Sequence, residues 1–256
     1  MTTTNIQRFS VFGLLGQSLS ILSQNLVPFG TIALIVTLPT FAYALLTGTS
    51  VVTADVQHVN GGYYAGESVF GFGAITALLL QMVLRCVAVG AISYGVFREL
   101  LGQRVSLDEA ISRAISVFLP VVGVAIVATL AICVAFALLV IPGFIVITML
   151  WLAVPVVVVE RPGVFASLSR SAVLTKGHRW RILGVLLIIG ISSYVIEILV
   201  GRIFGAFGGT FIVDLLQWLV TAVIAAYSAV TIATGYSILR FEKEGVDVHS
   251  IAQVFD

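Results

Sequence analysis

Arg85 and Gln81 are the polar side chains placed deepest in an apolar run, LLLQMVLRCVAVG. They lie four residues apart and therefore share one face of a helix. A charge at that depth costs at least about 2.5 kcal/mol, so we expect this face to point into a helix bundle, opposite Glu197 or Asp214. Two interpretations stay open. One is a buried ion pair or proton-linked site that moves during transport. The other is a static pair that fixes helix register, or an arginine extended toward a headgroup.

Two further polar groups lie near the ends of apolar runs. Asp214 and Gln217 are three residues apart, so they face either the bundle or a shallow outer cavity, unless they are ordinary interfacial polarity. Arg179, Trp180 and Arg181 open another run. Basic residues beside tryptophan suit anionic headgroups, which favours either a lipid site or plain anchoring at the interface.

Residue patterns for catalysis and metal binding are missing from the sequence. The three histidines, His58, His178 and His249, are far apart in the expected topology, and His-Glu-x-x-His, Gly-x-Ser-x-Gly and a phosphate loop do not occur. Cys86 and Cys133 both sit in apolar runs, which excludes a disulfide scaffold and a cysteine zinc site. We therefore expect no enzyme, no metal and no cofactor.

The composition indicates the elements that position these residues. Of 256 residues, 59% are hydrophobic and 10% are charged, against about 25% charged in soluble domains. A soluble fold would have to expose much of that apolar surface, so a membrane protein is expected. The net charge of +1 implies no nucleic-acid partner.

The apolar runs predict an all-α membrane protein with six spans, since a crossing needs about 20 apolar residues. The 46 uncharged residues from Ala114 to Val159 are too long for one helix and are expected to turn at Ile141-Pro142-Gly143. The whole chain forms one membrane domain. The spans are expected at about 26–47, 69–97, 118–140, 144–159, 182–200 and 211–239.

Lysine and arginine indicate the orientation of these spans. Eleven of the 13 fall in one set of connecting segments, Arg202 falls in the other, and Arg85 is inside a span. The positive-inside rule then places both termini and the 98–117 and 160–181 segments in the cytoplasm. We expect a multi-pass protein of a bacterial inner membrane.

An amphipathic segment precedes each odd-numbered span and predicts a cytoplasmic interfacial helix with its apolar face in acyl chains. The apolar stripes are Phe12, Leu15, Leu19, Leu22 and Leu26; then Leu107, Ala110, Ile111, Ala114, Ile115 and Phe118, after a Ser106–Glu109 capping box; then Val164, Leu168 and Ala172, with Ser167, Ser169, Arg170 and Ser171 on the remaining surface. A threefold repeat of interfacial helix, span and span follows. Such repeats are common in transporters, but a hairpin duplicated to make a stable bundle also produces them, and this second interpretation is favoured.

From about residue 100 the pattern resembles a bacterial membrane family, the glycerophosphoryl diester phosphodiesterase membrane domain, and related uncharacterised domains. The residues that carry the resemblance are Ile141-Pro142-Gly143-Phe144, Val154 to Glu160, Ser167 to Gly177 with Arg181, and Gly235 to Asp247. In the proteins that name the family, a separate soluble barrel performs the hydrolysis. A barrel of about 250 residues is not found here, so the resemblance implies the fold and not the phosphodiesterase activity.

The resemblance draws attention to Glu160, which follows the fourth expected span, and to Arg170 and Lys176 on the next amphipathic segment. A Glu160–Arg170 contact would hold that segment against the membrane face, and movement of the segment would gate a cavity. The alternative is a surface ion pair worth under about 1 kcal/mol.

Three functions stay open from the sequence. We expect first a non-enzymatic protein that binds or moves a lipid or amphiphile, or organises the envelope. The second is a channel or transporter for small solutes, and the third is an accessory subunit of a membrane complex. Expected partners are membrane lipids, with a second copy of the chain or another membrane protein as possible partners.

Overall fold

The computed structural model describes residues 9–47, 88–96, 118–205 and 210–245, which are almost entirely helical. The elements are α1 (Val11–Gln24), α2 (Leu26–Thr47), α5 (Phe118–Leu138), α6 (Val140–Leu150), α7 (Ala153–Val159), α8 (Val164–Leu174), α9 (Arg179–Gly205) and α10 (Thr210–Glu244). Residues 88–96 are also helical. The expected all-α class is confirmed for these residues.

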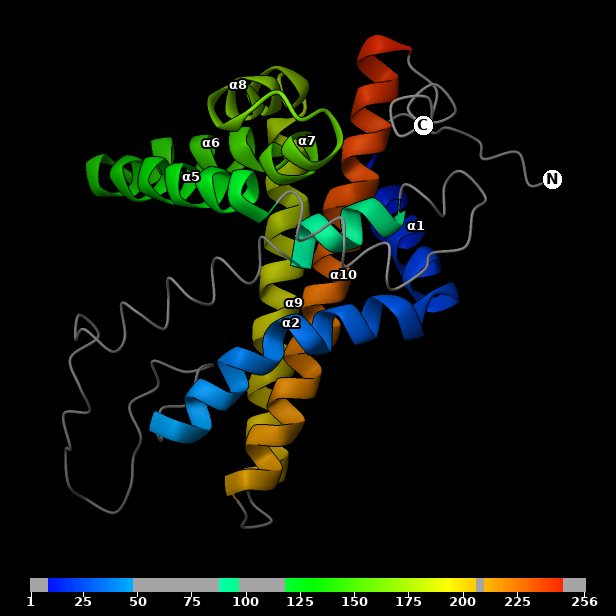
Figure 1. The fold of residues 1–256 in the computed structure, drawn as a ribbon, viewed down its shortest axis with the longest axis vertical. Helices are drawn as coiled ribbons and strands as arrows, with labels where there is room; N and C mark the ends of the chain where they lie inside the picture. Colours follow the sequence, from blue (N-terminus) through cyan, green and yellow to red (C-terminus); the bar gives the residue numbers. More distant parts are fainter. Residues whose placement is uncertain (1–8, 48–87, 97–117, 206–209, 246–256) are drawn as a thin grey trace.

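The long helices α9 and α10 lie side by side and form the axis of the molecule (Figure 1). With α5 and with α6–α7 taken together, they make four helices that are long and apolar enough to cross a membrane, or five if α1 and α2 count as one bent span. The count of six and the threefold repeat stay predictions. Most of the second expected span, with Gln81 and Arg85, and the capping-box segment at 106–117 lie outside the described residues.

Helix α1 meets α2 at Asn25 with a bend of 92°, close to the expected boundary between interfacial helix and span. Its buried face is formed by Leu14, Ser18 and Leu22, whereas Phe12 is 81% and Leu19 is 58% exposed. Of the expected apolar stripe, Phe12, Leu19 and Leu26 are exposed, whereas Leu22 is buried beside Leu14 and Ser18. One face of α1 packs on the protein, and a second face presents Phe12 and Leu19 outward, where acyl chains suit them.

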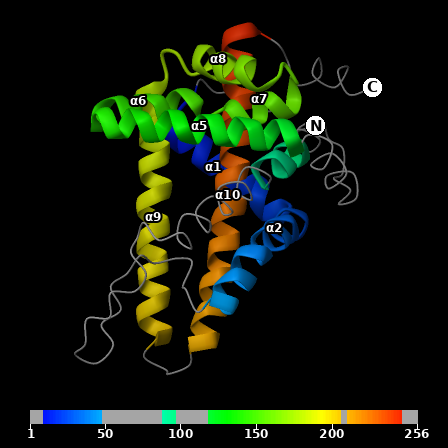
Figure 2. The same ribbon diagram turned by 60° about the vertical axis from the view of Figure 1, so that its left-hand side comes forward.

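The α5–α6 hairpin runs across the α9–α10 axis in both ribbon views, with α6 packed against α5 (Figures 1 and 2). The chain reverses at Leu139, which is extended, and not at the expected Ile141-Pro142-Gly143. Pro142 instead occupies the first turn of α6, where a missing N–H costs nothing. Gly143 permits the close approach of the two helices, because a Cβ there would lie 2.4 Å from the Phe136 ring.

The fourth expected span, at about 144–159, is interrupted near its middle. Helix α6 ends at Leu150 and α7 begins at Ala153, with Trp151 and Leu152 between them. Trp151 turns into the core and is 9% exposed. Its ring lies against Gly235 of α10, where a Cβ would stand 2.6 Å from Cη2, so this glycine admits the indole.

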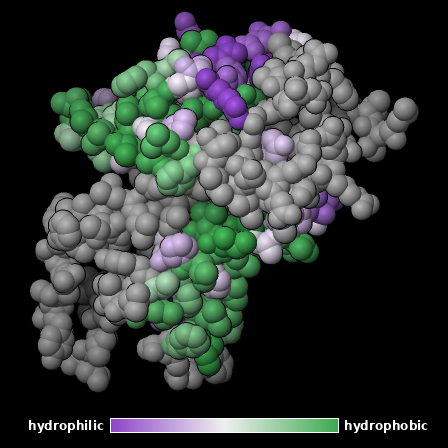
Figure 3. All heavy atoms as spheres, in the orientation of Figure 1, coloured by the Kyte–Doolittle hydropathy of each residue, from purple (hydrophilic) through white to green (hydrophobic). Residues whose placement is uncertain are grey.

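Hydrogen bonds from aromatic side chains join the N-terminal helices to α10. Trp218 Nε1 donates to Thr37 Oγ1 over 3.0 Å, and its ring stacks on Phe41. Tyr227 OH donates to the Leu15 carbonyl over 3.1 Å. Polar side chains gather near α8 and the C-terminal end of α10, while apolar ones cover the visible parts of α5, α6, α9 and α10 (Figure 3).

Candidate site: an ion-pair network at the end of α10

A tight reversal after α7 brings α8 back toward Glu160. Arg161 has φ 51° and Gly163 has φ 94°, with Pro162 between them. The conformation of Gly163 is one that side chains rarely adopt. It starts α8 so that its second turn, with Arg170, lies beside Glu160, the last residue before the reversal.

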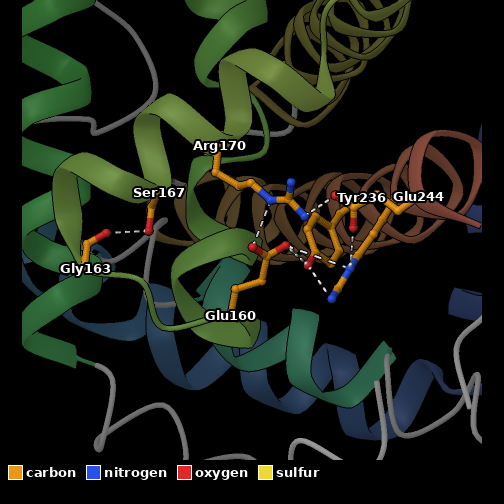
Figure 4. Close-up of polar contacts among 7 residues, drawn as sticks. Glu160, Gly163, Ser167, Arg170, Tyr236 and Glu244 are labelled. Atoms are coloured by element: carbon orange, nitrogen blue, oxygen red, sulfur yellow. Dashed lines mark hydrogen bonds and ion pairs between the residues drawn. The ribbon is translucent and has the colours of Figure 1, made fainter. Parts of the chain in front are cut away.

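Glu160 is the centre of a network that joins α7, α8 and α10 (Figure 4). Arg170 Nε donates to Glu160 Oε2 over 3.0 Å. Tyr236 OH donates to Glu160 Oε1 over 2.7 Å and accepts from Arg240 Nη1 over 2.9 Å. Glu244 contacts Arg170 Nη2, and its Oε2 lies 3.4 Å from Arg240 Nε. The Glu160–Arg170 contact expected from the sequence is therefore present, within a larger cluster.

The network lies beyond the part of α10 that a membrane core would cover. Helix α10 has 35 residues, about 52 Å of helix against about 30 Å of hydrocarbon. Tyr236, Arg240 and Glu244 occupy its last turns at spacings of four, which places them on one face. That spacing of four is a signal present in the sequence, but the apolar run that continues to Leu239 assigns Tyr236 to the sixth span and hides it.

Charge in the network is nearly balanced and partly withdrawn from water. The side chains of Glu160 and Arg240 are 17% and 15% exposed. Partial burial acts to lower the pKa of Arg170, but hydrogen bonds and charges from Glu160 and Glu244 outweigh it, so the pKa of this guanidinium is raised. Arg170 therefore stays charged, and the cluster contributes more than an isolated surface pair would.

The face of α8 that packs on α6 and α7 carries small hydroxyl side chains. Ser167, Ser171 and Leu174 are buried. Ser171 Oγ donates to the Met149 carbonyl over 2.6 Å and accepts from Leu152 N–H over 3.1 Å. The expectation that Ser167 and Ser171 cover the polar surface of α8 is wrong, because the break between α6 and α7 frees backbone groups that a buried hydroxyl can satisfy.

Replacing Ser171 with alanine is expected to lower the free energy of unfolding by about 1–3 kcal/mol, since two buried backbone groups lose their side-chain partner. The measurement is unfolding by SDS titration in mixed micelles. Ser169→Ala is the matched control, because Ser169 is exposed on the same helix. Equal stability of the two variants would contradict the role given to Ser171.

A second set of polar contacts ties the N-terminal residues to α9 and α10. Arg181 Nη1 donates to the Phe9 carbonyl over 2.7 Å, and Phe9 N–H donates to Glu242 Oε2 over 3.4 Å. His178 Nε2 lies 3.4 Å from Glu242 Oε1. Lys243 Nζ donates to the carbonyls of Val173 and Lys176 at the end of α8, over 2.8 and 2.7 Å. The last turns of α10 thus contact the beginning of α1, the end of α8 and the start of α9.

The remaining residues expected to form sites are dispersed. Trp180, at the start of α9, is 85% exposed and is flanked by Arg179 and Arg181, as an interfacial anchor requires. At the opposite end of the α9–α10 pair, Gln217 lies close to Gly201, and Asp214 is partly buried on the same face of α10.

Glu197 is partly buried in α9 and has an interaction partner. The expected contact of Arg85 with Glu197 or Asp214, and the shared face of Arg85 and Gln81, lie outside the described residues. The Lys176 side chain is exposed, and the Lys176 carbonyl accepts the hydrogen bond from Lys243 Nζ.

The chemistry available to the network is electrostatic. Its guanidinium and carboxylate groups are paired with each other, and within the described ranges no three His, Cys, Asp or Glu residues gather as metal ligands. The arrangement can hold α8 against α10.

Comparisons of the chain with protein-family models, with curated proteins and with solved structures find no match. The resemblance to the glycerophosphoryl diester phosphodiesterase membrane domain therefore stays a prediction.

Proposed function

We propose that this chain is a non-enzymatic protein of a bacterial inner membrane, with both termini in the cytoplasm, that binds or moves a lipid or another amphiphile. The observation that carries the proposal is the separation of its surfaces. Charged groups of the described residues gather where α8, the start of α9 and the end of α10 meet. The surfaces of α2, α5, α6 and α9 expose large apolar side chains over most of their length.

An amphiphile needs both kinds of surface close together. Arg179, Trp180 and Arg181 supply basic and aromatic groups suited to an anionic headgroup, and exposed Ile188 and Ile191 on α9 continue the same helix as an apolar surface for acyl chains. The charged network lies beside this position, because α8 ends just before α9 begins. Movement of α8 against α10 would therefore change the surroundings of the position at which a headgroup binds.

A solute channel fits these helices less well. The buried face of α10 toward α2 consists of Ala222, Ala226, Ala229, Val230 and Ala233. Such a face favours close helix packing over a water-filled path. The accessory-subunit function is favoured by a different observation, the long exposed apolar face of α9, which a membrane partner would cover as well as lipid does.

Native mass spectrometry of the protein, released from its own membranes at low detergent, tests the proposal. We expect a lipid or amphiphile to stay bound to the wild type and to be lost from Arg179→Gln/Arg181→Gln. Arg202→Gln, at the other end of α9, is the matched control and should retain it. The same experiment on Arg85→Leu asks whether that residue contributes.

Each other outcome of this experiment contradicts the proposal. A protein that arrives bare would exclude stable lipid binding. A protein that arrives with a second polypeptide and no lipid would favour the accessory subunit. A lipid retained equally by all variants would show the belt of lipid that surrounds any membrane protein.

A further inference from the structure

The α5–α6 hairpin is the part of the fold least like a pair of membrane spans, although each arm is apolar enough to be one. It lies across α9 and α10 in both ribbon views. If α9 and α10 cross the membrane, the hairpin axis runs along the membrane plane. The side of the membrane is given by its neighbours, because it packs on α7 and α8 and contacts the first half of α9.

The tip of the hairpin has no group that favours water. Leu138, Leu139, Val140 and Ile141 are 73%, 66%, 61% and 74% exposed. From Leu130 to Ile147 the sequence contains no charged, hydroxyl or amide side chain. The α9–α10 hairpin differs, since exposed Arg202 and partly buried Asp214 lie near its turn. A tip that reached the far aqueous face would be expected to carry such groups.

The backbone of the tip is adapted to an environment without water. Leu139 N–H donates to the Ala135 carbonyl over 3.1 Å, and the Leu139 carbonyl accepts from Gly143 N–H over 3.3 Å. Pro142 has no N–H to satisfy. The reversal therefore pairs both backbone groups of Leu139 at the tip, as a turn within hydrocarbon requires.

We propose that the α5–α6 hairpin is embedded lengthwise in a single leaflet, the one at which α9 begins, with the acyl chains of that leaflet as its partner. The inference rests on the proposed membrane and lipid role, and it names the surface that contacts lipid. Trp180 and the basic residues beside it mark the headgroup level, and the hairpin lies just within. It enlarges the protein's cross-section in one leaflet alone.

Depth measurements with nitroxide labels on the full chain in liposomes test this arrangement. In a Cys86→Ala/Cys133→Ala background, single cysteines replace exposed Leu119, Ile126 or Leu138 on α5, and Leu187, Ile191 or Leu199 on α9 as controls. Leu119 and Leu138 are 19 residues apart, about 28 Å of helix. We expect the three α5 labels to share one depth within about 5 Å, the diameter of the Cα cylinder, and the α9 labels to differ.

An α5 depth profile that changes along the helix as the α9 profile does would overturn the proposal, and so would α9 labels that do not change in depth. A second measurement does not depend on depth. In intact cells, Ile141→Cys is expected to resist a membrane-impermeant maleimide added outside, while Arg202→Cys reacts. Reaction of both would show that the tip crosses. Neither outcome alters the lipid retained in native mass spectrometry, so the hairpin and the lipid-binding proposals fail independently.

Discussion

Replacement of Glu160 with alanine is expected to lower the free energy of unfolding by about 3 kcal/mol, the lower end of the range for breaking a buried pair. Arg170 and Arg240 would lose the carboxylate that lies between them and keep Glu244 as their carboxylate partner, Arg240 would still donate to Tyr236 OH, and Tyr236 OH would lose its acceptor. The measurement is SDS titration in mixed micelles. Lys176→Ala is the control, because this lysine side chain is exposed just after α8.

A double-mutant cycle separates the network from a simple loss of packing. We expect Glu160→Ala and Arg170→Ala to be non-additive by about 1–2 kcal/mol, as residues of one network are, whereas an exposed pair contributes about 0.2–1 kcal/mol. Hydrogen exchange should increase in α8 and stay unchanged in the middle of α9. If the two losses of unfolding free energy add within about 0.3 kcal/mol, the contacts are independent and do not form a network.

The class of the protein and the larger helices could be predicted from apolar run lengths alone. The beginning of α2 at Leu26, and the approximate extents of α9 and α10, agree with runs expected at 26–47, 182–200 and 211–239. A long run of uncharged residues contains no charged residue that would mark where one helix ends and the next begins. Between Ala114 and Val159 the sequence predicts a turn at Pro142, but proline is favourable in the first turn of a helix, and the chain reverses three residues before it.

Only part of the site could be predicted, because some of its residues are close together in the sequence and others are far apart. Glu160 and Arg170 are ten residues apart across a glycine turn, which local reasoning can bring together. Tyr236, Arg240 and Glu244 meet them only through the docking of α10, which leaves no local signal beyond their spacing of four. Hydropathy alone assigns Ser171 to the polar face of α8, whereas the backbone break that its hydroxyl satisfies is a tertiary feature.

The network and the α5–α6 hairpin are parts of one mechanical unit. Arg170 is held by Glu160 and Glu244, α8 is held on the α6–α7 break by Ser171, and α6 continues into the hairpin. If the hairpin is embedded as proposed, a change in the leaflet around it would reach the end of α10 through α8. A direct contact between α6–α7 and α10, the Trp151 ring against Gly235, joins these elements without α8.

Gly235→Ala is expected to disrupt that contact. An added Cβ would stand 2.6 Å from Trp151 Cη2 and 2.8 Å from Cζ3, closer than any real Cβ contact. Alanine in place of glycine gains up to about 1 kcal/mol of helix propensity, while forced overpacking of a filled core costs about 1–3 kcal/mol. Because Trp151 is buried and its ring is rigid, we expect the overpacking to prevail, with a net loss of about 1–2 kcal/mol.

Two variants distinguish steric overlap from other effects of the substitution. Gly190→Ala in α9 adds the same methyl group where nothing lies within 4 Å, so it should be neutral or slightly stabilising. Trp151→Leu combined with Gly235→Ala should recover stability relative to Trp151→Leu alone, because the methyl group then fills part of the space left by the indole. If Gly235→Ala were as stable as Gly190→Ala, the indole would have room to shift, and α6–α7 would not be held rigidly on α10.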